Sequence, residues 1–158
     1  QGAVSRLPVE LEGSGETVNT KLQTPVLFVA AGTGIAPVRG LIHEREAVRT
    51  LKSSVGGRDE SRLPVNDNVG ELDSDNILLF GCRKEKADFY YEEEWQGMEK
   101  SGRLGLLTAF SRDQWHKIYV QQKLQKANEN DAFLARHILE KSGAIYVAGG
   151  PKMARAVK

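Results

Sequence analysis

The turn Gly32-Thr33-Gly34 follows a short apolar run and precedes a helical pattern. Glycines let backbone N–H groups come close to a ligand, and the N-terminus of the next helix favours an anion at the same place. Pro37 occupies the position of the third glycine in a dinucleotide fingerprint, G-x-G-x-x-G, but proline also suits the first turn of a helix. These residues alone therefore fit either a phosphate-binding turn or a tight connection that binds nothing.

A second group of side chains, between residues 111 and 119, offers more specific chemistry. Ser111 and Arg112 follow an apolar run and provide a hydroxyl and a planar fork of donors, which fit a phosphate monoester. Lys117 adds a positive charge, and the ring of Tyr119 offers a flat face on which adenine can stack. The residues about 20 positions after the glycine turn, TLKSS, contain no acid to bind an adenosine ribose. The pattern favours a pocket for the 2′-phosphate of NADP; the alternative is a solvated basic helix start with a core tyrosine.

Cys82 and Arg83 end another apolar run. A lone buried cysteine is most often a small hydrophobic residue, whereas an arginine at this strand end can reach a diphosphate. The acidic run 92–94 is typical of a solvated helix face. The three histidines lack the spacing of metal ligands, so we expect no metal site. No G-K-S/T follows a glycine run, which excludes a P-loop.

Four short apolar runs are predicted to be the strands that position these residues. Each is rich in Val, Ile, Leu or aromatic residues and is bounded by Gly or polar residues. The runs are nearly continuous rather than alternating, which is typical of parallel strands covered by helices on both faces. They comprise residues 26–31, 76–82, 104–110 and 144–150.

Helical patterns lie between the predicted strands. Side chains from Val38 to Val48 keep the spacing of an amphipathic helix. Further helices are predicted over residues 88–102, 118–127 and 131–143. Asp131 is expected to cap the last of them, and Gly102 and Gly143 are expected to end two of them. The alternation predicts a doubly wound α/β fold, in which the strand ends meet at one edge of the sheet.

The composition of the 158-residue chain is typical of one soluble globular domain, with 40% hydrophobic and 27% charged residues. A net charge of +1 gives no sign of nucleic acid or of a membrane surface as a partner. No apolar run approaches the ~20 residues of a membrane span. The single cysteine excludes an internal disulfide and suits a reducing compartment. Residues 1–23 are expected to be a connector, and the polar segment at about 50–75 a flexible insertion or, alternatively, a functional loop.

Five stretches in this order resemble the NADP-binding module of the NADPH–cytochrome P450 reductase family, within the ferredoxin–NADP reductase group. They are GTGIAPVRG, LLFGCRKEKADFYYEEEW, LTAFSRD, KIYVQQKL and IYVAGGPKMARAVK. The resemblance implies a doubly wound parallel sheet of five strands in the order 3-2-1-4-5, its last strand truncated in this chain. It also implies an enzyme in which residues 24–158 bind NADPH and residues 1–23 connect to an FAD-binding domain. Hydride would pass from NADPH to FAD, and electrons onward to FMN in a separate domain.

The family's cofactor contacts can be carried over to matching positions in this chain. Thr33 falls beside the nicotinamide and the diphosphate, and its positioning role is the nearest to a catalytic one that we expect. The contacts to adenine and the 2′-phosphate fall on Ser111, Arg112, Lys117, Tyr119 and Gln121. The other expected cofactor-binding residues are Gly32, Gly34, Cys82, Arg83, Gly149, Gly150 and Met153.

The end of the fourth predicted strand departs from the family pattern. P450 reductases usually have Cys-Gly-Asp there, with the cysteine beside the nicotinamide to assist hydride transfer, whereas this chain has Ala148-Gly149-Gly150. The acidic residue that often follows in the next helix is Ala156. This strand end therefore offers no cysteine to assist hydride transfer, and Cys82, on a different strand, is not its replacement.

Alanine at position 148 is similar to the cytosolic NADPH-dependent diflavin reductases, which pass electrons to an iron–sulfur protein of cytosolic Fe–S cluster assembly. That branch implies a cytoplasmic location and a protein electron acceptor. Three alternatives remain: an electron donor to a haem protein, a non-catalytic NADP-binding or sensor domain, and an α/β nucleotide-binding domain without a redox role, such as a phosphate-ester transferase. No Arg-Tyr-Ser motif for FAD occurs, so the chain alone is expected to bind NADP without turning over.

Overall fold

A parallel four-stranded sheet forms the centre of the protein in a computed structural model that describes residues 24–55, 74–132 and 139–157. The strand order is β3-β2-β1-β4. Every neighbouring pair is parallel, with Val26 opposite Asn76 on one side of β1 and opposite Ala144 on the other. The strands are β1 (Val26–Ala31), β2 (Asn76–Cys82), β3 (Gly105–Phe110) and β4 (Ala144–Ala148). The predicted order 3-2-1-4 is confirmed; the fifth strand implied by the resemblance is not seen in the described residues.

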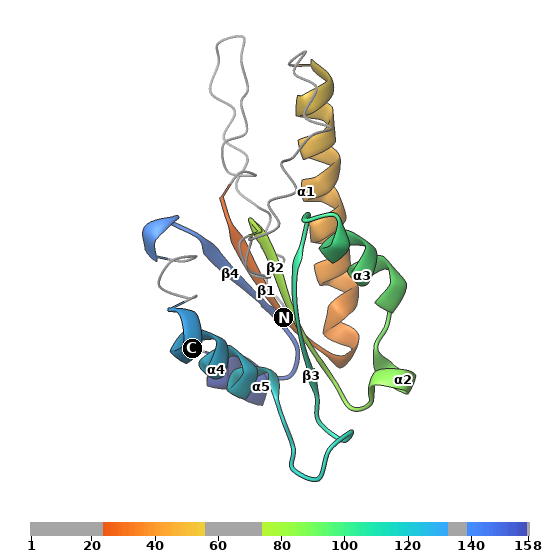
Figure 1. The fold of residues 1–158 in the computed structure, drawn as a ribbon, viewed down its shortest axis with the longest axis vertical. Helices are drawn as coiled ribbons and strands as arrows, with labels where there is room; N and C mark the ends of the chain where they lie inside the picture. Colours follow the sequence, from red (N-terminus) through yellow and green to blue (C-terminus); the bar gives the residue numbers. More distant parts are fainter. Residues whose placement is uncertain (1–23, 56–73, 133–138, 158) are drawn as a thin grey trace.

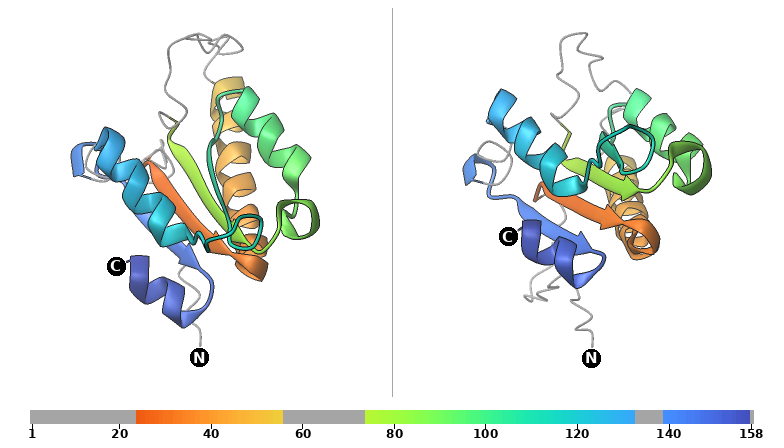
Figure 2. Two further views of the ribbon diagram at one scale, coloured as in Figure 1. Left: turned by 60° about the horizontal axis from the view of Figure 1, so that its bottom comes forward. Right: turned by 90° about the horizontal axis from the view of Figure 1, so that it is seen from below.

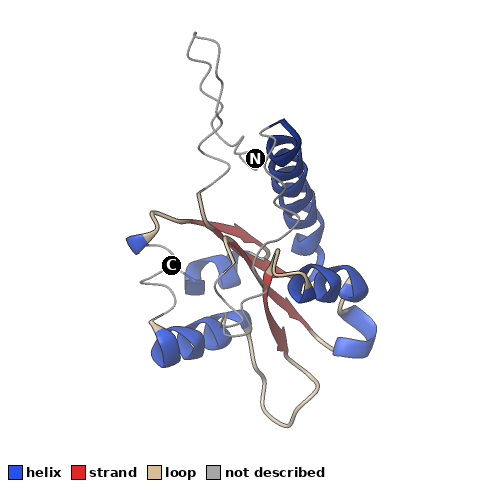
Figure 3. Ribbon diagram, turned by 45° about the horizontal axis from the view of Figure 1, so that its top comes forward, coloured by secondary structure: helices blue, strands red, loops and turns tan. Residues whose placement is uncertain are grey.

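Helices cover both faces of the sheet (Figures 1 and 3). The 3-10 turn η2 (Gly32–Gly34) leads into α1 (Ile35–Val55), which shares one face with α3 (Glu92–Lys100). The other face carries α4 (Val120–Asp131) and α5 (Pro151–Val157), and the short α2 (Glu85–Asp88) follows β2. Figure 2 shows the two helix layers from below, on opposite sides of the sheet. The doubly wound α/β fold predicted from the sequence is confirmed.

The alternation of side chains along the strands creates two separate hydrophobic cores. Phe28 and Phe80 pack toward α1 and α3, together with Trp95, whereas Val29 and Leu79 pack toward α4. All five side chains are almost completely buried. This two-sided burial explains why the strand sequences are continuously apolar.

The helix predicted over 88–102 begins later than expected, at Glu92 of α3, and Asp88 instead ends the separate helix α2. Phe89 is buried between Phe80 and Phe110, with ring centroids 5.7 and 5.6 Å away. In one continuous helix Phe89 and Trp95 would lie about 120° apart around the axis, so both could not face the same core. The chain therefore turns between them, with Tyr91 in the left-handed region at a φ of 63°. Gly102, at a φ of 68°, follows α3 as predicted.

Helix α1 is longer than its amphipathic pattern indicated. It continues to Val55, so residues 50–55 of the expected insertion are helical. The physical reason is that no Gly or Pro occurs between Gly40 and Gly56. Residues 56–73, the rest of that insertion, and the expected connector 1–23 lie outside the described residues.

The middle of the helix predicted over 131–143 lies outside the described residues, and within the described part residues 139–140 are helical. Asp131 is the last residue of α4 rather than an N-cap, and Ala132 ends that helix at a φ of 46°. Residues 133–138 lie outside the described part. Before β4 the left-handed residue is Ser142, at a φ of 52°, rather than Gly143. None of the described helices has the length and apolarity to cross a membrane.

A buried polar cluster closes the end of the sheet where the strands begin. Arg45 of α1 donates from Nε to Asn76 Oδ1 and from Nη2 to the carbonyl oxygen of Thr24, both at 2.7 Å. Asn76 in turn donates to Glu46 Oε1 at 3.2 Å. Burial lowers the pKa of Arg45, and the nearby Asp75 and Glu46 oppose that shift. The cluster joins α1 to the start of β2, so this end of the sheet is closed by the fold itself.

Candidate nucleotide-binding site

A cavity of about 720 Å³ opens at the opposite end, where the strands finish. Its wall is formed by the turn after β1, the end of β2, the residues on either side of the β3–α4 loop, and the first turn of α5. In the view from below, the ends of these elements converge (Figure 2). Its size is that of a typical cofactor site, and its place is where open α/β sheets bind ligands.

The glycine turn after β1 has two different constraints. Gly32 has a φ of 55°, and a side chain built on it would meet nothing within 4 Å, so its backbone faces open space in the cavity wall. Gly34 is instead packed against β4, because a Cβ there would lie 2.2 Å from the carbonyl oxygen of Ala148. Thr33, exposed between them, lines the cavity. The turn therefore brings Gly32 and Thr33 to the cavity, while Gly34 is needed for packing.

Cys82 and Arg83, at the end of β2, both line the cavity as predicted. Burial, and after it the nearby carboxylates of Asp88, Asp113 and Glu85, together raise the pKa of the Cys82 thiol to about 11. The thiol is therefore neutral at physiological pH and is a poor nucleophile. Arg83 is an exposed basic side chain in the cavity wall. This strand end offers a cation for an anionic ligand rather than a reactive sulfur.

The loop between β3 and α4, residues 111–119, starts on a firmly bonded base. The backbone N–H groups of Ser111 and Arg112 donate to the carbonyl oxygens of Cys82 and Arg83, at 2.9 and 2.8 Å. Asp113 accepts a hydrogen bond from the N–H of Glu85 at 2.7 Å, which ties the loop to α2. These bonds prolong the β2–β3 pairing beyond the strands. They hold the Ser111 side chain in the cavity wall beside Cys82 and Arg83.

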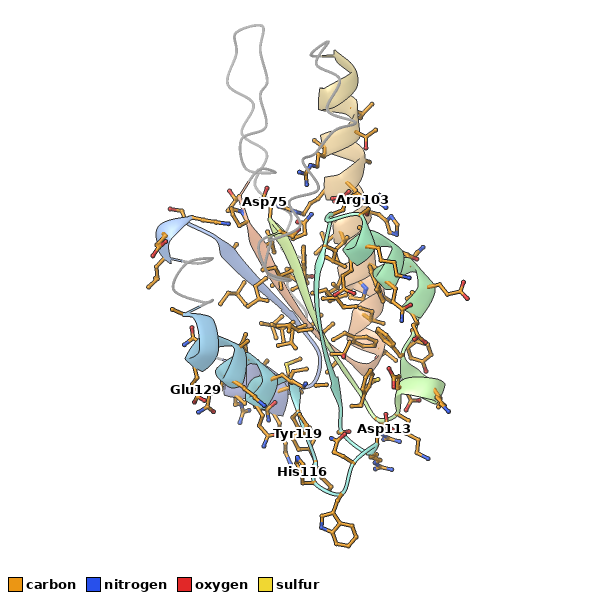
Figure 4. The ribbon with its side chains drawn as sticks, in the orientation of Figure 1. Asp75, Arg103, Asp113, His116, Tyr119 and Glu129 are labelled. Atoms are coloured by element: carbon orange, nitrogen blue, oxygen red, sulfur yellow. The ribbon has the colours of Figure 1, made fainter. Side chains whose placement is uncertain are left out.

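The predicted residues of this loop divide between the wall and the rim of the cavity. Ser111, Tyr119 and Gln121 line it, whereas Arg112 and Lys117 are exposed side chains outside its wall. Tyr119 is 44% exposed and immediately precedes α4. Figure 4 shows Asp113, His116 and Tyr119 together at this end of the molecule, and Asp75 and Arg103 at the other. The ring of Tyr119 is thus free to accept a planar partner.

The β4–α5 connection contributes one predicted residue and one that the sequence analysis missed. Met153 lines the cavity. A Cβ at Gly149 would lie 2.3 Å from Met153 Cε, the flexible end of that side chain, and 3.3 Å from Ala31 Cβ, whereas Gly150 faces open space; neither glycine lies in the wall. Lys152, an exposed cation in the wall, was missed, although its place just after a strand end could have identified it. Asp88 and Tyr90, also in the wall, were missed because they follow a strand without forming a motif.

The charges around the cavity favour an anionic ligand. Arg83 and Lys152 lie in its wall, and Arg112 and Lys117 lie on the adjoining loop. Two of the three nearby carboxylates accept backbone hydrogen bonds, Asp113 from Glu85 and Asp88 from Lys84 at 3.2 Å. Within the described ranges, no group of three metal-ligating side chains occurs. The open backbone at Gly32, the cations and the exposed ring of Tyr119 fit a phosphorylated nucleotide.

Comparison with known proteins agrees with this geometry. Residues 28–158 match the family described as the oxidoreductase NAD-binding domain. The chain is 40% identical over 148 residues to the NADPH–cytochrome P450 reductase of Drosophila melanogaster, which covers 93% of this chain and 19% of that protein. It is 37% identical over 148 residues to NADPH-dependent diflavin oxidoreductase 1 of Xenopus laevis, covering 94% of this chain and 20% of that protein.

A third relative, NADPH-dependent diflavin oxidoreductase 1 of Aspergillus fumigatus, is 34% identical over 158 residues, covering 99% of this chain and 22% of that protein. The chain spans about a fifth of the length of these curated relatives. The resemblance predicted from the five sequence stretches is confirmed, since both reductase types are among the relatives. The cavity and the family match lead to the same assignment: this chain belongs to the oxidoreductase NAD-binding domain family.

Proposed function

We propose that this chain is the NADPH-binding module of a flavoprotein oxidoreductase and presents NADPH to FAD held by another domain. One observation carries the proposal. The turn at Gly32–Thr33 and the segment Ser111–Gln121, far apart in sequence, border a single cavity at the end of the sheet. A dinucleotide needs two such groups of contacts, one for each of its nucleotides. The similarity to NADPH-dependent reductases supports the choice of NADPH over other dinucleotides.

The two ends of the cavity have distinct tasks in this proposal. Ser111, Arg112 and Lys117 bind the 2′-phosphate through a hydroxyl and two cations, and Tyr119 stacks on adenine, with Gln121 beside it. Arg83 and Lys152 neutralise the diphosphate.

Gly32 and Thr33 position the nicotinamide end. When bound, NADPH supplies the hydride and FAD accepts it, so the chain's own residues need only bind, orient and exclude water.

This assignment of roles agrees with the low reactivity of the one thiol in the cavity wall. The only cysteine, Cys82, has its pKa raised to about 11. At the end of β4, Ala148 occupies the place where the reductase family usually has a cysteine. Binding and orientation are then the contributions of this domain to hydride transfer.

Flavin reduction tests the proposed activity. The chain is joined to the FAD-binding domain of a diflavin reductase, and the flavin absorbance is followed after mixing with NADPH or NADH. We expect rapid reduction by NADPH, slow reduction by NADH, and a loss of this difference in Arg112→Ala. If calorimetry detects bound NADPH while the flavin stays oxidised, the chain is a non-catalytic NADP-binding or sensor domain instead.

We further propose that the electrons continue through FMN to an iron–sulfur protein, with a cytoplasmic location for the complete enzyme. Ala148 and the similarity to the diflavin oxidoreductases support this acceptor. The similarity to the cytochrome P450 reductases favours the competing acceptor, a haem protein. The two are separated by measuring which acceptor is reduced by the complete flavin-loaded protein with NADPH. Reduction of the haem protein alone would overturn the iron–sulfur assignment.

A further inference from the structure

The tip of the β3–α4 loop carries an aromatic side chain with no structural role in the described protein. Trp115 is 103% exposed, whereas the other tryptophan, Trp95, is completely buried. A fully exposed indole is unusual because tryptophan is among the most highly buried residues on average. Trp115 is also the most exposed of the large hydrophobic side chains described. Its exposure calls for a partner that is not part of this chain's described fold.

Hydrogen bonds hold both ends of the β3–α4 loop, but not its tip. Its base is held by backbone bonds from Ser111 and Arg112, and Gln114 Nε2 donates to the Phe110 carbonyl oxygen at 2.5 Å. At its other end Tyr119 N–H donates to Gln122 Oε1 at 2.8 Å. Between these anchors, residues 115–117 make no hydrogen bond or ion pair with any described residue. The tip can therefore change position without breaking a bond of the fold.

The position of Trp115 relative to the cavity limits what the indole can reach. Ser111 and Tyr119 both line the cavity, and Trp115 is four residues from each of them. Four residues of extended chain span at most about 14 Å, so the tip stays close to the cavity mouth whatever its conformation. Ile118, next to Tyr119, adds an apolar wall at this end. A planar apolar ligand bound beside Tyr119 is within reach of the indole.

The charges of the loop identify which part of a ligand lies there. Arg112 and Lys117 flank Trp115, three residues before it and two after it. A phosphate held by these cations and Ser111 places the attached adenosine at the same loop. Adenine is an aromatic ring that stacks readily on tryptophan. The neighbouring cations and aromatic wall thus favour a nucleotide base over an apolar protein surface.

We propose that the indole of Trp115 closes over the adenine of bound NADP(H), on the face opposite Tyr119. The proposal rests on the proposed function, because it requires NADP(H) in the cavity. Trp115 is then a binding residue that acts on the base, whereas Arg112 and Lys117 act on the 2′-phosphate. Its contribution is expected to be the same for NADP+ and NAD+, which share the adenine ring.

Tryptophan fluorescence of the 158-residue chain tests the proposal directly. Trp95 provides a buried internal reference, and Trp115 is the only other tryptophan. Titration with NADP+ is expected to quench and blue-shift the exposed component of the emission. Trp115→Phe is expected to abolish this change while preserving part of the stacking. In parallel, calorimetry with NADP+, NAD+ and 2′,5′-ADP measures the affinity of each variant.

Trp115→Ala is expected to weaken all three ligands by about 3- to 10-fold, with Trp115→Phe in between and the NADP+/NAD+ ratio unchanged. His116→Ala, an exposed neighbour on the same tip, is the matched control and should leave the affinities unchanged. If Trp115→Ala leaves the affinities unaltered, and saturating NADP+ leaves the tryptophan emission of the unmodified chain unaltered, the role of Trp115 is overturned while the proposed function stands. If Trp115→Ala lowers the affinity for a flavin domain but leaves the affinity for NADP+ unchanged, Trp115 serves docking of that domain instead. Absence of NADP+ binding by the unmodified chain would overturn the proposed function as well.

Discussion

The turn after β1 and the loop after β3 border the same cavity, yet the fold constrains them differently. In the turn, residues 32–34, Gly34 sits so close to β4 that a Cβ would lie 2.2 Å from a backbone oxygen. In the loop, residues 111–119, hydrogen bonds fix the backbone at both ends while Arg112, Trp115 and Lys117 remain exposed. The turn is therefore largely explained by packing, and the loop's side chains are explained only by a ligand.

This difference separates stability from binding in the two regions. Substitutions in the turn are expected to lower the free energy of unfolding, because they change backbone conformation or close packing. Substitutions of exposed loop side chains are expected to lower affinity while leaving stability nearly unchanged.

The largest expected effect concerns Cys82, which lies in the cavity wall between the two regions. Its pKa is raised from 9.0 to about 11, so at neutral pH its thiolate fraction is roughly 100-fold below that of an ordinary thiol. We expect alkylation by iodoacetamide to be slower by at least that factor, and its rate to rise steadily with pH until about 11.

The same shift affects stability in a defined direction. The folded state holds the Cys82 proton more tightly than the unfolded state does. The resulting contribution to the free energy of unfolding is complete below pH 9.0 and is lost as the pH rises toward about 11. Cys82→Ala should remove this part of the pH dependence of urea unfolding. Rapid alkylation at pH 7 would indicate a reactive thiol and would contradict the proposal that the cavity wall binds the nucleotide without a reactive cysteine.

Gly34→Ala is expected to have the next largest effect, on stability. The added methyl group would collide with the Ala148 carbonyl oxygen, and overpacking of this kind costs about 1–3 kcal/mol. Urea unfolding measures the change. Gly40→Ala is a matched control in α1, because a Cβ there meets nothing within 4 Å and alanine is the better helix former. A Gly34→Ala protein as stable as the control would show that packing does not constrain the turn.

Gly32→Ala should have a smaller effect on stability. Its φ of 55° disfavours any side chain by about 1–2 kcal/mol, although the space around it is open. Because Gly32 also lines the cavity, the substitution should lower the affinity for NADP+ as well as the stability. Calorimetry and unfolding on the same sample separate the two effects. A loss of affinity with no loss of stability would show that Gly32, like the exposed side chains of the loop, serves binding rather than the stability of the fold.

The sequence predicted the sheet and much of the site because both depend on local patterns. Continuous apolar runs mark strands buried on both faces. Ser111 and Tyr119 were identified because they follow a strand end, whereas Gln121 came from the family resemblance. The non-helical turn at Phe89 was missed because it depends on ring contacts with Phe80 and Phe110. These two residues lie on neighbouring strands, and no local pattern around Phe89 reveals them. Lys152 was missed because a single lysine forms no motif.

The glycines illustrate the limit of motif reasoning most clearly. Gly34 and Gly149 were expected to bind the cofactor, but for Gly34 the structure provides a packing reason, its close approach to the Ala148 carbonyl oxygen. Ala148 lies more than 100 residues after the turn. A local pattern cannot distinguish a glycine needed for a ligand from one needed for a distant strand. Their role in binding stays a prediction.

The central claim is that the β3–α4 loop reads the 2′-phosphate, and a thermodynamic cycle tests it most directly. Calorimetry measures the affinities of NADP+ and NAD+ for the unmodified chain and for Arg112→Ala. We predict that the substitution weakens NADP+ by about 1–3 kcal/mol and NAD+ by less than about 0.5 kcal/mol, without loss of stability. Equal weakening of both ligands, or equal affinities in the unmodified chain, would contradict the claim.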